Sequence, residues 1–477
     1  MKEASSKTND HCLSRRSFVI LLIMKGSMMK KLAALGLLAV LVLTSIAPAF
    51  AQDKVTLTWY IGLGTGAQPE QQEVQEAVVE AFNNSQDRIE VVMNVVENSV
   101  AYDTLSTLIA AGNAPDIIGP VGTDGSNGFG DSYLDLTPYV EGYDLSIWPE
   151  AAVDFYRTDA SGLIGLPLAT YPSMTWYRPD LFDEAGLNPL PANYGDPYVW
   201  EDGTEAEWNI ETMTELAKIL TVDANGNDAT MEEFDPENIV QWGFDFQWYG
   251  DGRQIPTMFG NFSLYNPETG EAEVGDAWRA GFQWWYDGMW TEHFIPNAAQ
   301  EGSDLLAAGN VFDSGNVAMA NTQLWYTCCV QGTEWDIAPV PSYNGETIAR
   351  LHADTFRIYE GTEHPEEAVE FLYYLVTDAS LDLLGVYGGM PAIIEDQPAF
   401  FDGLDETYTQ GVNWQVALDG VAYADVPSHE AWFPNYLAAR DRVTQFVTLL
   451  NSTPDLDVQA ELDALQADLQ TLFDEAS

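Results

Sequence analysis

Segments with strand patterns alternate with segments with helix patterns between residues 54 and 120, and this alternation limits the folds that the chain can adopt. Segments 54–62, 88–96 and 115–120 are rich in β-branched and aromatic residues, as strands are. Segments 71–85 and 101–115 carry apolar residues at helical spacing. Because strand–helix–strand–helix–strand is the unit that builds a parallel sheet, the sequence predicts an α/β fold.

The pattern continues, with a changed composition, through the rest of the chain. A further strand is predicted at 162–169, and from about residue 170 to residue 321 the chain is richer in Trp, Tyr, Asp and Gly. The remaining predictions are strands at 316–325 and 334–341, one helix at 364–384, and a closing pair of helices at 434–452 and 457–473. Both halves are therefore α/β, and the chain is too long for one core.

Residues 1–51 are predicted to be a secretory signal peptide. Lys30 and Lys31 precede an apolar run that is too short to span a membrane, and Ala51 ends a small-residue cleavage pattern. The core of the signal peptide is 28–51, and whether the protein starts upstream of this core stays open. Whether the twin-arginine-like segment 14–20 is used stays open. We expect an exported protein, periplasmic or extracellular, without a lipid anchor because no cysteine ends the apolar run.

The charge excludes some partners. The chain has 74 acidic and 18 basic residues, a formal net charge of −56. Such a surface repels nucleic acid, which we do not expect as a partner. The spread of the acids favours a role in solubility over cation binding. Cys12 lies in the leader, so Cys328 and Cys329 are the cysteines of the exported chain. They form either a vicinal disulfide or two free thiols.

The search for catalytic motifs finds none. His293, His352, His364 and His429 are isolated and lack metal-ligand spacing, and no G-x-S-x-G motif is present. We therefore expect a protein that is not an enzyme, with no metal and no cofactor. A pair of carboxylates for glycoside hydrolysis stays open among so many acids.

Two loops imitate ligand motifs. Segment 62–67 (GLGTGA) fits a loose dinucleotide fingerprint, but export counts against a nicotinamide cofactor, and a glycine loop near a small ligand is the better interpretation. Segment 223–235 imitates a calcium loop, but Asp228 stands where glycine is needed and Phe234 where glutamate is needed. A solvated turn is the better interpretation there.

The aromatic residues give the strongest functional signal. The chain has 15 Trp and 22 Tyr, and many lie beside polar residues. Trp and Tyr rings stack on the flat faces of pyranose sugars, while Asp, Glu, Asn and Gln bind the hydroxyl groups. Trp248, Trp325 and Trp432 each lie at a turn or loop edge near polar residues. For each of them, core packing and ligand stacking both stay open.

At this point the ordered motifs match a family. They are "LTWYIG…QQEVQEAVVEAFN", "LIAAGNAPDII", "GLIGLPLATYPSMTWYRPDLFDEAGLNPLP", "FDSGNVAMANTQLW", "WDIAPVP", "HPEEAVEFLYYLVTDAS" and "GGMPA". In this order the chain resembles the family 1 extracellular solute-binding proteins, the sugar-capturing subunits of ABC importers. The resemblance implies a two-lobed periplasmic-binding-protein fold, type II-like, with hinge crossings between the lobes. It also implies a monomer that closes on a carbohydrate and docks on the transmembrane subunits of an ABC permease.

By the resemblance, lobe 1 comprises 52–168 plus 353–400, and lobe 2 comprises 169–352 plus 401–477. The implied ligand contacts are Gly64, Thr65, Gln68, Thr123, Asp124, Tyr171, Asp245, Trp248, Trp325, Asp354 and Trp432. The chain departs from the family pattern at Gly119-Pro120, where an aromatic residue is usual, and 193–209 looks like an insertion of open role. In the crossing strand, Tyr171 is expected to face ligand. Of Trp176 and Tyr177, one is expected in the core and the other pointing away.

Two other functions stay open on the sequence alone. One is a secreted glycan-active enzyme. The other is a binding protein for a non-sugar, cationic solute.

Overall fold

The computed structural model describes residues 54–122, 128–158, 162–249, 252–260, 264–266, 268–425 and 434–476. The signal-peptide prediction therefore lies outside the described residues. Residues Val55–Ser477 form one compact unit, which contains every element described below. No helix within the described ranges is both long enough and apolar enough to cross a membrane.

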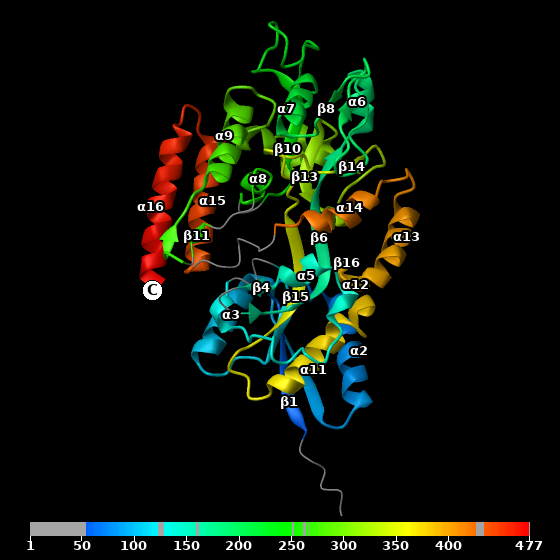
Figure 1. Ribbon diagram of the computed structural model, residues 1–477, viewed down its shortest axis with the longest axis vertical. Coiled ribbons are helices and arrows are strands. Elements are labelled where there is room, and N and C mark those ends of the chain that lie inside the picture. The colour runs from blue at the N-terminus through cyan, green and yellow to red at the C-terminus, as the bar shows by residue number, and fades with distance from the viewer. Residues whose placement is uncertain are drawn as a thin grey trace, which may run out of the picture. The chain divides into compact units, whose positions relative to one another are not determined.

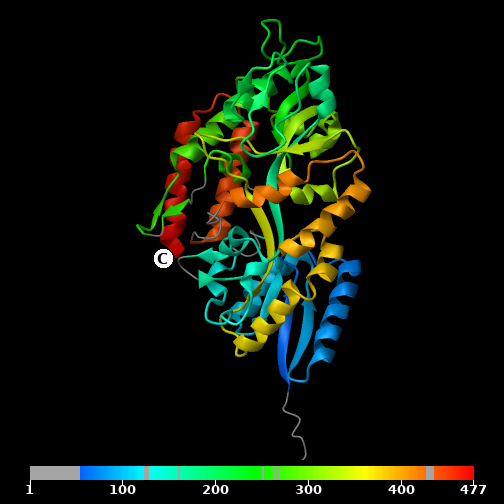
Figure 2. The ribbon, with the colours of Figure 1, turned by 45° about the vertical axis from the view of Figure 1, so that its right-hand side comes forward.

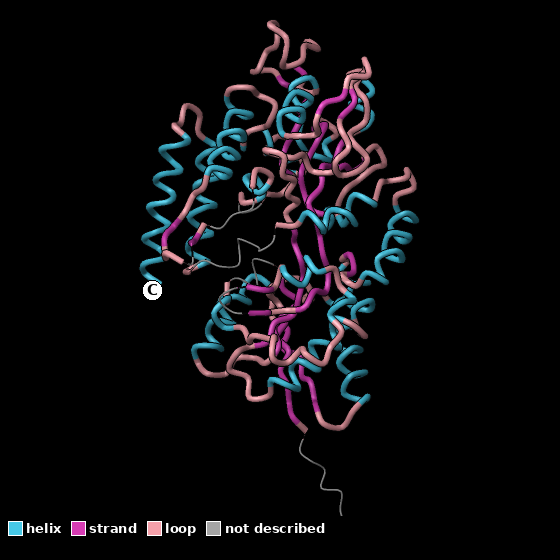
Figure 3. The backbone as a smooth tube through the Cα atoms, viewed as in Figure 1, coloured by secondary structure: helices cyan, strands magenta, loops and turns pink. Residues whose placement is uncertain are grey.

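A ten-stranded mixed sheet runs through this unit, with helices on both sides (Figures 1 and 3). Its order is β2-β1-β3-β15-β6-β13-β10-β9, and β14 and β16 each pair with β6. The strands are β1 Val55–Ile61, β2 Ile89–Val95, β3 Ile117–Val121, β6 Leu166–Tyr177, β9 Val222–Asp223, β10 Ile239–Phe246, β13 Val317–Gln323, β14 Asp336–Ala338, β15 Leu351–Ile358 and β16 Met390–Pro391. Short hairpins join β4 Arg157–Thr158 to β5 Gly162–Leu163, β7 Tyr198–Val199 to β8 Glu205–Ala206, and β11 Tyr265–Asn266 to β12 Glu271–Ala272.

The helices follow the predicted alternation near the start of the described chain, and the predicted pair of helices closes it. They are α2 Pro69–Ser85, α3 Asn98–Ala110, α5 Glu150–Asp154, α6 Pro179–Glu184, α7 Ile210–Ile219, α8 Gln254–Thr257, α9 Asp276–Trp290, α10 Ala298–Glu301, α11 Pro365–Val376, α12 Ser380–Tyr387, α13 Gln397–Thr407, α14 Gln415–Gly420, α15 Tyr436–Ser452 and α16 Val458–Ala476. In Figures 1 and 2, α15 and α16 lie beside α9.

The predicted parallel unit is confirmed, because β1 pairs in parallel with both β2 and β3. Alternate residues of β1 point to opposite faces of the sheet. Trp59 packs on the face that α2 covers, with Phe356 and Phe371 at ring-centroid distances of 5.7 Å. Tyr60 packs on the α3 face, where its hydroxyl donates to the Ala101 carbonyl at 2.7 Å. Both faces of this parallel sheet are therefore buried, as its near-continuous apolar strands require.

Strand β6 passes from one hydrophobic core to another. All twelve of its residues are buried. Trp176 belongs to the core that contains Trp59 and packs on Tyr326 at 5.4 Å, whereas Tyr177 belongs to a second core and packs on Phe182 at 5.4 Å. Alternation sends the two rings to different cores, as predicted, but the ring that points away from the second core is not exposed, because apolar residues cover both faces of β6.

The prediction of one helix over 364–384 was wrong. Helix α11 ends at Val376, and α12 begins at Ser380. Thr377 has φ −123° and ψ −85°, which is not helical, and its hydroxyl donates to the Tyr373 carbonyl at 2.6 Å. The apolar spacing continues through the break, so the pattern alone does not reveal it.

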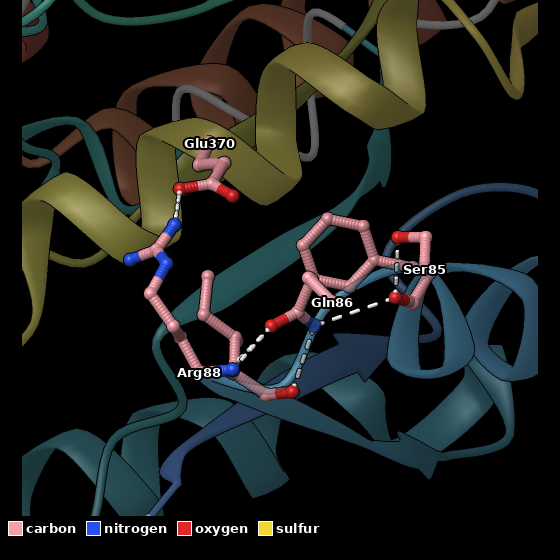
Figure 4. A network of polar contacts seen from close by, with 6 residues as sticks. Ser85, Gln86, Arg88 and Glu370 are labelled. Atoms are coloured by element: carbon pink, nitrogen blue, oxygen red, sulfur yellow. Dashed lines mark hydrogen bonds and ion pairs between the residues drawn. The ribbon is translucent and has the colours of Figure 1, made fainter. Parts of the chain in front are cut away.

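A polar network fixes the turn between α2 and β2 (Figure 4). The Gln86 side chain accepts hydrogen bonds from the Arg88 and Ile89 backbone amides at 2.7 Å. The guanidinium of Arg88 pairs with Glu370 of α11 at 2.5 Å. Both charged side chains are solvent-exposed, so this pair adds little stability and mainly positions the turn.

The segment 193–209 forms ordered structure. It contains the β7–β8 hairpin, and Tyr194 stacks on Tyr423 with ring centroids 4.1 Å apart. The indole of Trp208 donates to the Pro339 carbonyl at 2.9 Å. These contacts attach the segment to β14 and to the region after α14.

Candidate functional site

Three nearly parallel rings lie side by side where β15 and β13 flank β6 and β10 follows β13 in the sheet. The planes of Trp248 and Trp325 differ by 3°, with centroids 6.2 Å apart. The planes of Trp325 and His352 differ by 23°, with centroids 6.3 Å apart. These separations exceed those of face-to-face stacking, so the rings are offset. We call Trp248, Trp325 and His352 the aromatic row.

The strand ends position the two tryptophans. Trp248 follows β10 and Trp325 follows β13, two parallel neighbours whose carboxyl ends meet at one edge. In open α/β sheets, ligands bind at such an edge. Trp248 has φ +52°, and its indole nitrogen donates to the Gly309 carbonyl at 3.0 Å. The ring is held in place although 44% of the residue is exposed, so it offers apolar surface to solvent.

Hydrogen bonding joins Trp325 to His352. The Trp325 indole Nε1 donates to His352 Nδ1 at 3.2 Å. Nδ1 is therefore the accepting nitrogen of the imidazole. Trp325 lies in the 3₁₀ turn Leu324–Cys328, and a disulfide joins Cys328 to Cys329 at the end of this turn. Of the two alternatives for the cysteine pair, the structure has the vicinal disulfide.

Tyr171 and Asp354 form the next polar contact along the crossing strands. The Tyr171 hydroxyl donates to Asp354 Oδ2 at 3.2 Å. Burial raises the pKa of Asp354 to about 6, and the Tyr171 hydrogen bond partly offsets this rise. Burial, and then the negative charge of Asp354, raise the pKa of Tyr171 well above its usual value. A Cβ added to Gly122 would lie 3.3 Å from Asp354 Oδ1, so the carboxylate also borders the end of β3.

The glycine loop after β1 works as a helix cap. Thr65 Oγ1 accepts from Gln71 Nε2 at 2.7 Å, and Gln71 Oε1 accepts from the Gly66 backbone amide at 2.8 Å. Gln68 is the N-cap residue of α2, and its side chain is exposed. A Cβ at Gly64 would lie 2.9 Å from the Pro120 carbonyl oxygen, so glycine lets this loop approach β3 closely.

Asp245 lies away from solvent on β10, between Phe244 and Phe246. It is fully buried, and its Oδ1 accepts from the Phe246 backbone amide at 2.7 Å. Burial, and then the negative charge of Glu301, raise its pKa well above the usual value. Its contact with ligand stays a prediction.

The loop that resembles a calcium-binding motif has a structural role. Asp223 is buried, and its carboxylate accepts hydrogen bonds from the backbone amides of Asn225, Asn227 and Asp235 at 2.8 to 3.0 Å. The calcium-like segment is therefore a turn, but not a solvated one at this acid. Across the described ranges, no group of three or more His, Cys, Asp or Glu side chains is placed to hold a metal ion.

Some predicted contacts fall elsewhere. Thr123, Asp124 and Trp432 lie outside the described residues. The sequence reasoning missed His352, which it treated as an isolated histidine. The signal that could have found it is its position two residues before Asp354, because alternate residues of a strand share a face.

Comparison with known proteins agrees with this architecture. A sequence profile described as bacterial extracellular solute-binding protein matches residues 66–381, more than half of the chain. No curated protein sequence matches the chain.

Solved structures share the fold at low sequence identity. UspC of Mycobacterium tuberculosis matches with TM-score 0.65 and 20% identity, over 88% of this chain and 100% of that one. The cyclic alpha-maltosyl-1,6-maltose binding protein of Arthrobacter globiformis matches with TM-score 0.64 and 15% identity, over 88% and 100%. The sugar-binding protein MalE of Xanthomonas citri matches with TM-score 0.64 and 15% identity, over 88% of this chain and 98% of that one. The extent of the profile match, together with this fold, places the chain in the family of bacterial extracellular solute-binding proteins.

Proposed function

We propose that this protein binds a carbohydrate outside the cytoplasm and delivers it to an ABC-type permease. The observation that carries the proposal is the aromatic row, because offset parallel rings at a sheet edge suit the flat faces of pyranose units. Two structural neighbours, the cyclic alpha-maltosyl-1,6-maltose binding protein and the sugar-binding protein MalE, support the same ligand class.

The proposed contacts divide by chemistry. Trp248 and Trp325 stack on sugar rings, and Tyr171 and Asp354 bind hydroxyl groups. Gly64, Thr65 and Gln68 meet the ligand from the loop before α2, and Thr123, Asp124, Asp245 and Trp432 complete the proposed set. The hydroxyl of Tyr171 already donates to Asp354, so a ligand hydroxyl at this place would donate to the remaining carboxylate lone pairs.

Binding is coupled to closure of two lobes. Lobe 1 is proposed to comprise 52–168 plus 353–400, and lobe 2 to comprise 169–352 plus 401–477, with β6 and β15 as crossings. A ligand shifts the open–closed equilibrium only by binding the closed form more tightly, so it must contact both lobes. The aromatic row and the loop before α2 are contributed by different proposed lobes, which meets this requirement.

The test uses the purified chain without its leader and a panel of mono- and oligosaccharides. Isothermal titration calorimetry should detect binding of at least one sugar, and small-angle X-ray scattering should show a smaller radius of gyration with that sugar bound. A panel that gives neither heat nor a thermal shift would contradict the proposal.

The proposal includes export as a monomer and the absence of turnover. Labelled oligosaccharides incubated with the protein should be recovered intact. Product release that one carboxylate substitution abolishes would instead indicate a secreted glycan-active enzyme.

A further inference from the structure

A cavity of about 310 Å³ borders the second core beside the aromatic row and shares only Trp248 with that row. Its walls include the aromatic residues Phe246, Trp248 and Tyr249. Its polar lining comes from Glu301 at the end of α10 and from Asn451 and Thr448 of α15. Ligand pockets commonly combine aromatic walls with a few placed polar groups in this way.

Within the described residues, Glu301 of this cavity and the nearby Asp245 have no Lys or Arg partner. Among the hydrogen bonds and charge interactions of the described residues, those of Glu301 are with Tyr249, Asn451 and Asp245. Asp245 is fully buried nearby, and its Oδ2 has no hydrogen-bond partner within the described part of the chain. A buried carboxylate and a half-buried one, without a Lys or Arg partner among the described residues, are costly unless a proton or a bound cation neutralises them.

The hydrogen-bond donors that line the cavity already have partners, so the groups left to bind a ligand are acceptors. The Tyr249 hydroxyl donates to Glu301 Oε1 at 3.2 Å and accepts from Asn451 Nδ2 at 2.5 Å. The Thr448 hydroxyl donates to the Thr444 carbonyl of its own helix at 2.8 Å. Asn451 is only 6% exposed, and within the described residues its Oδ1 lacks a partner. The cavity therefore suits a ligand group that donates hydrogen bonds and has no acceptor of its own.

We propose that this cavity binds a primary ammonium group, held by Glu301, Asn451 Oδ1 and the faces of the surrounding aromatic rings. An ammonium group supplies three donors and no acceptor, and it is attracted to aromatic faces. A lone divalent ion fits less well, since no group of three metal-ligating side chains exists within the described residues. The ammonium group is carried either by a free amine or by an amino sugar.

The experiment titrates the leaderless protein with 1,4-diaminobutane and with glucosamine, using 1,4-butanediol and N-acetylglucosamine as neutral matches. We expect at least one ammonium probe to bind at least 10-fold more tightly than its neutral match. Binding of diaminobutane alone identifies a free amine as the source, and binding of glucosamine alone identifies an amino sugar. Equal affinities for charged and neutral probes would overturn the proposal.

Matched variants separate this cavity from the general negative surface. Glu301→Gln keeps the shape of the side chain and should weaken ammonium binding at least 10-fold. Asp304→Asn removes an exposed acid three residues away and should change it less than twofold. Equal losses in both variants would show that the amines bind the surface charge, which rejects the site.

A third variant keeps the test valid if Glu301→Gln does not fold. Thr448 is exposed on α15, so Thr448→Lys should fold while its own ammonium occupies the cavity. Amine binding should then be lost. Undiminished binding would contradict the proposal. Failure of every amine leaves neutral-sugar binding at the aromatic row untouched, so the two proposals fail separately.

Discussion

The hydroxyl of Tyr171 on β6 donates a hydrogen bond to Oδ2 of Asp354 on β15, at 3.2 Å. The two residues are far apart in sequence, and the antiparallel pairing of the crossing strands brings them together. The contact joins the two strands at the place where we propose that the lobes move.

Asp354→Asn should remove a pH dependence of stability. Burial raises the pKa of Asp354 from 3.8 to about 6 in the folded protein. Between these values the folded state binds more protons than the unfolded state, so the free energy of unfolding falls as pH rises through this window. The loss is roughly 1–3 kcal/mol. Urea denaturation at several pH values from 4 to 7 measures it.

The control for this prediction is Asp304→Asn, which alters an exposed acid. This variant should retain the fall in the free energy of unfolding that the unsubstituted protein shows between pH 4 and 6. If the free energy of unfolding fell by the same amount in Asp354→Asn, another titrating group would be the cause of the fall.

Trp325→Ala should weaken sugar binding. It removes the ring that lies between Trp248 and His352, and aromatic contacts of this kind contribute about 0.5–1.5 kcal/mol beyond their buried area. We expect a loss of affinity of about 10-fold or more by calorimetry, once a binding sugar is known. Trp200→Ala, in the hairpin segment, should bind normally, and a normal affinity in Trp325→Ala would remove this ring from the site.

The vicinal disulfide predicts how many free thiols the protein has before and after reduction. With the leader removed, the chain has Cys328 and Cys329 and no other cysteine. Thiol titration of the denatured, unreduced protein should therefore find no free thiol, and the same titration after reduction should find both. Both thiols reacting before reduction would show that the bond does not form in the exported protein.

Gly243→Ala should destabilise the protein strongly. The added Cβ would lie 1.9 Å from the Ala217 carbonyl oxygen, so β10 and α7 would have to separate. Overpacking of this kind costs about 1–3 kcal/mol and occasionally more. Thermal denaturation should show a clearly lower Tm.

Gly385→Ala is the matched control. Gly385 lies in α12 with no atom within 4 Å of the added Cβ. Alanine is the better helix former by about 0.5–1 kcal/mol, so this variant should keep or raise the Tm. A similar loss in both variants would contradict the steric explanation for Gly243.

Much of the local structure could be predicted. The segments around β1, β2, β3, α2 and α3 carry clear periodicity, and Gly186 ends α6 at φ +69°, as its position predicts. The turn positions of Trp248 and Trp325 were also predicted correctly. The break at Thr377 was missed because apolar spacing continues across it, and the burial of both Trp176 and Tyr177 was missed because strand alternation does not say what covers each face.

The sequence by itself determined the α/β class, the elements with strong periodicity and the aromatic residues available for binding, because these depend on local spacing and composition. Only the tertiary structure decided that Trp325 meets His352, that Tyr171 meets Asp354, and that Glu301 lies near Asp245. These pairs depend on strand order and register between distant segments. Pairings of this kind are fixed by the packing of the whole sheet, which no single segment encodes.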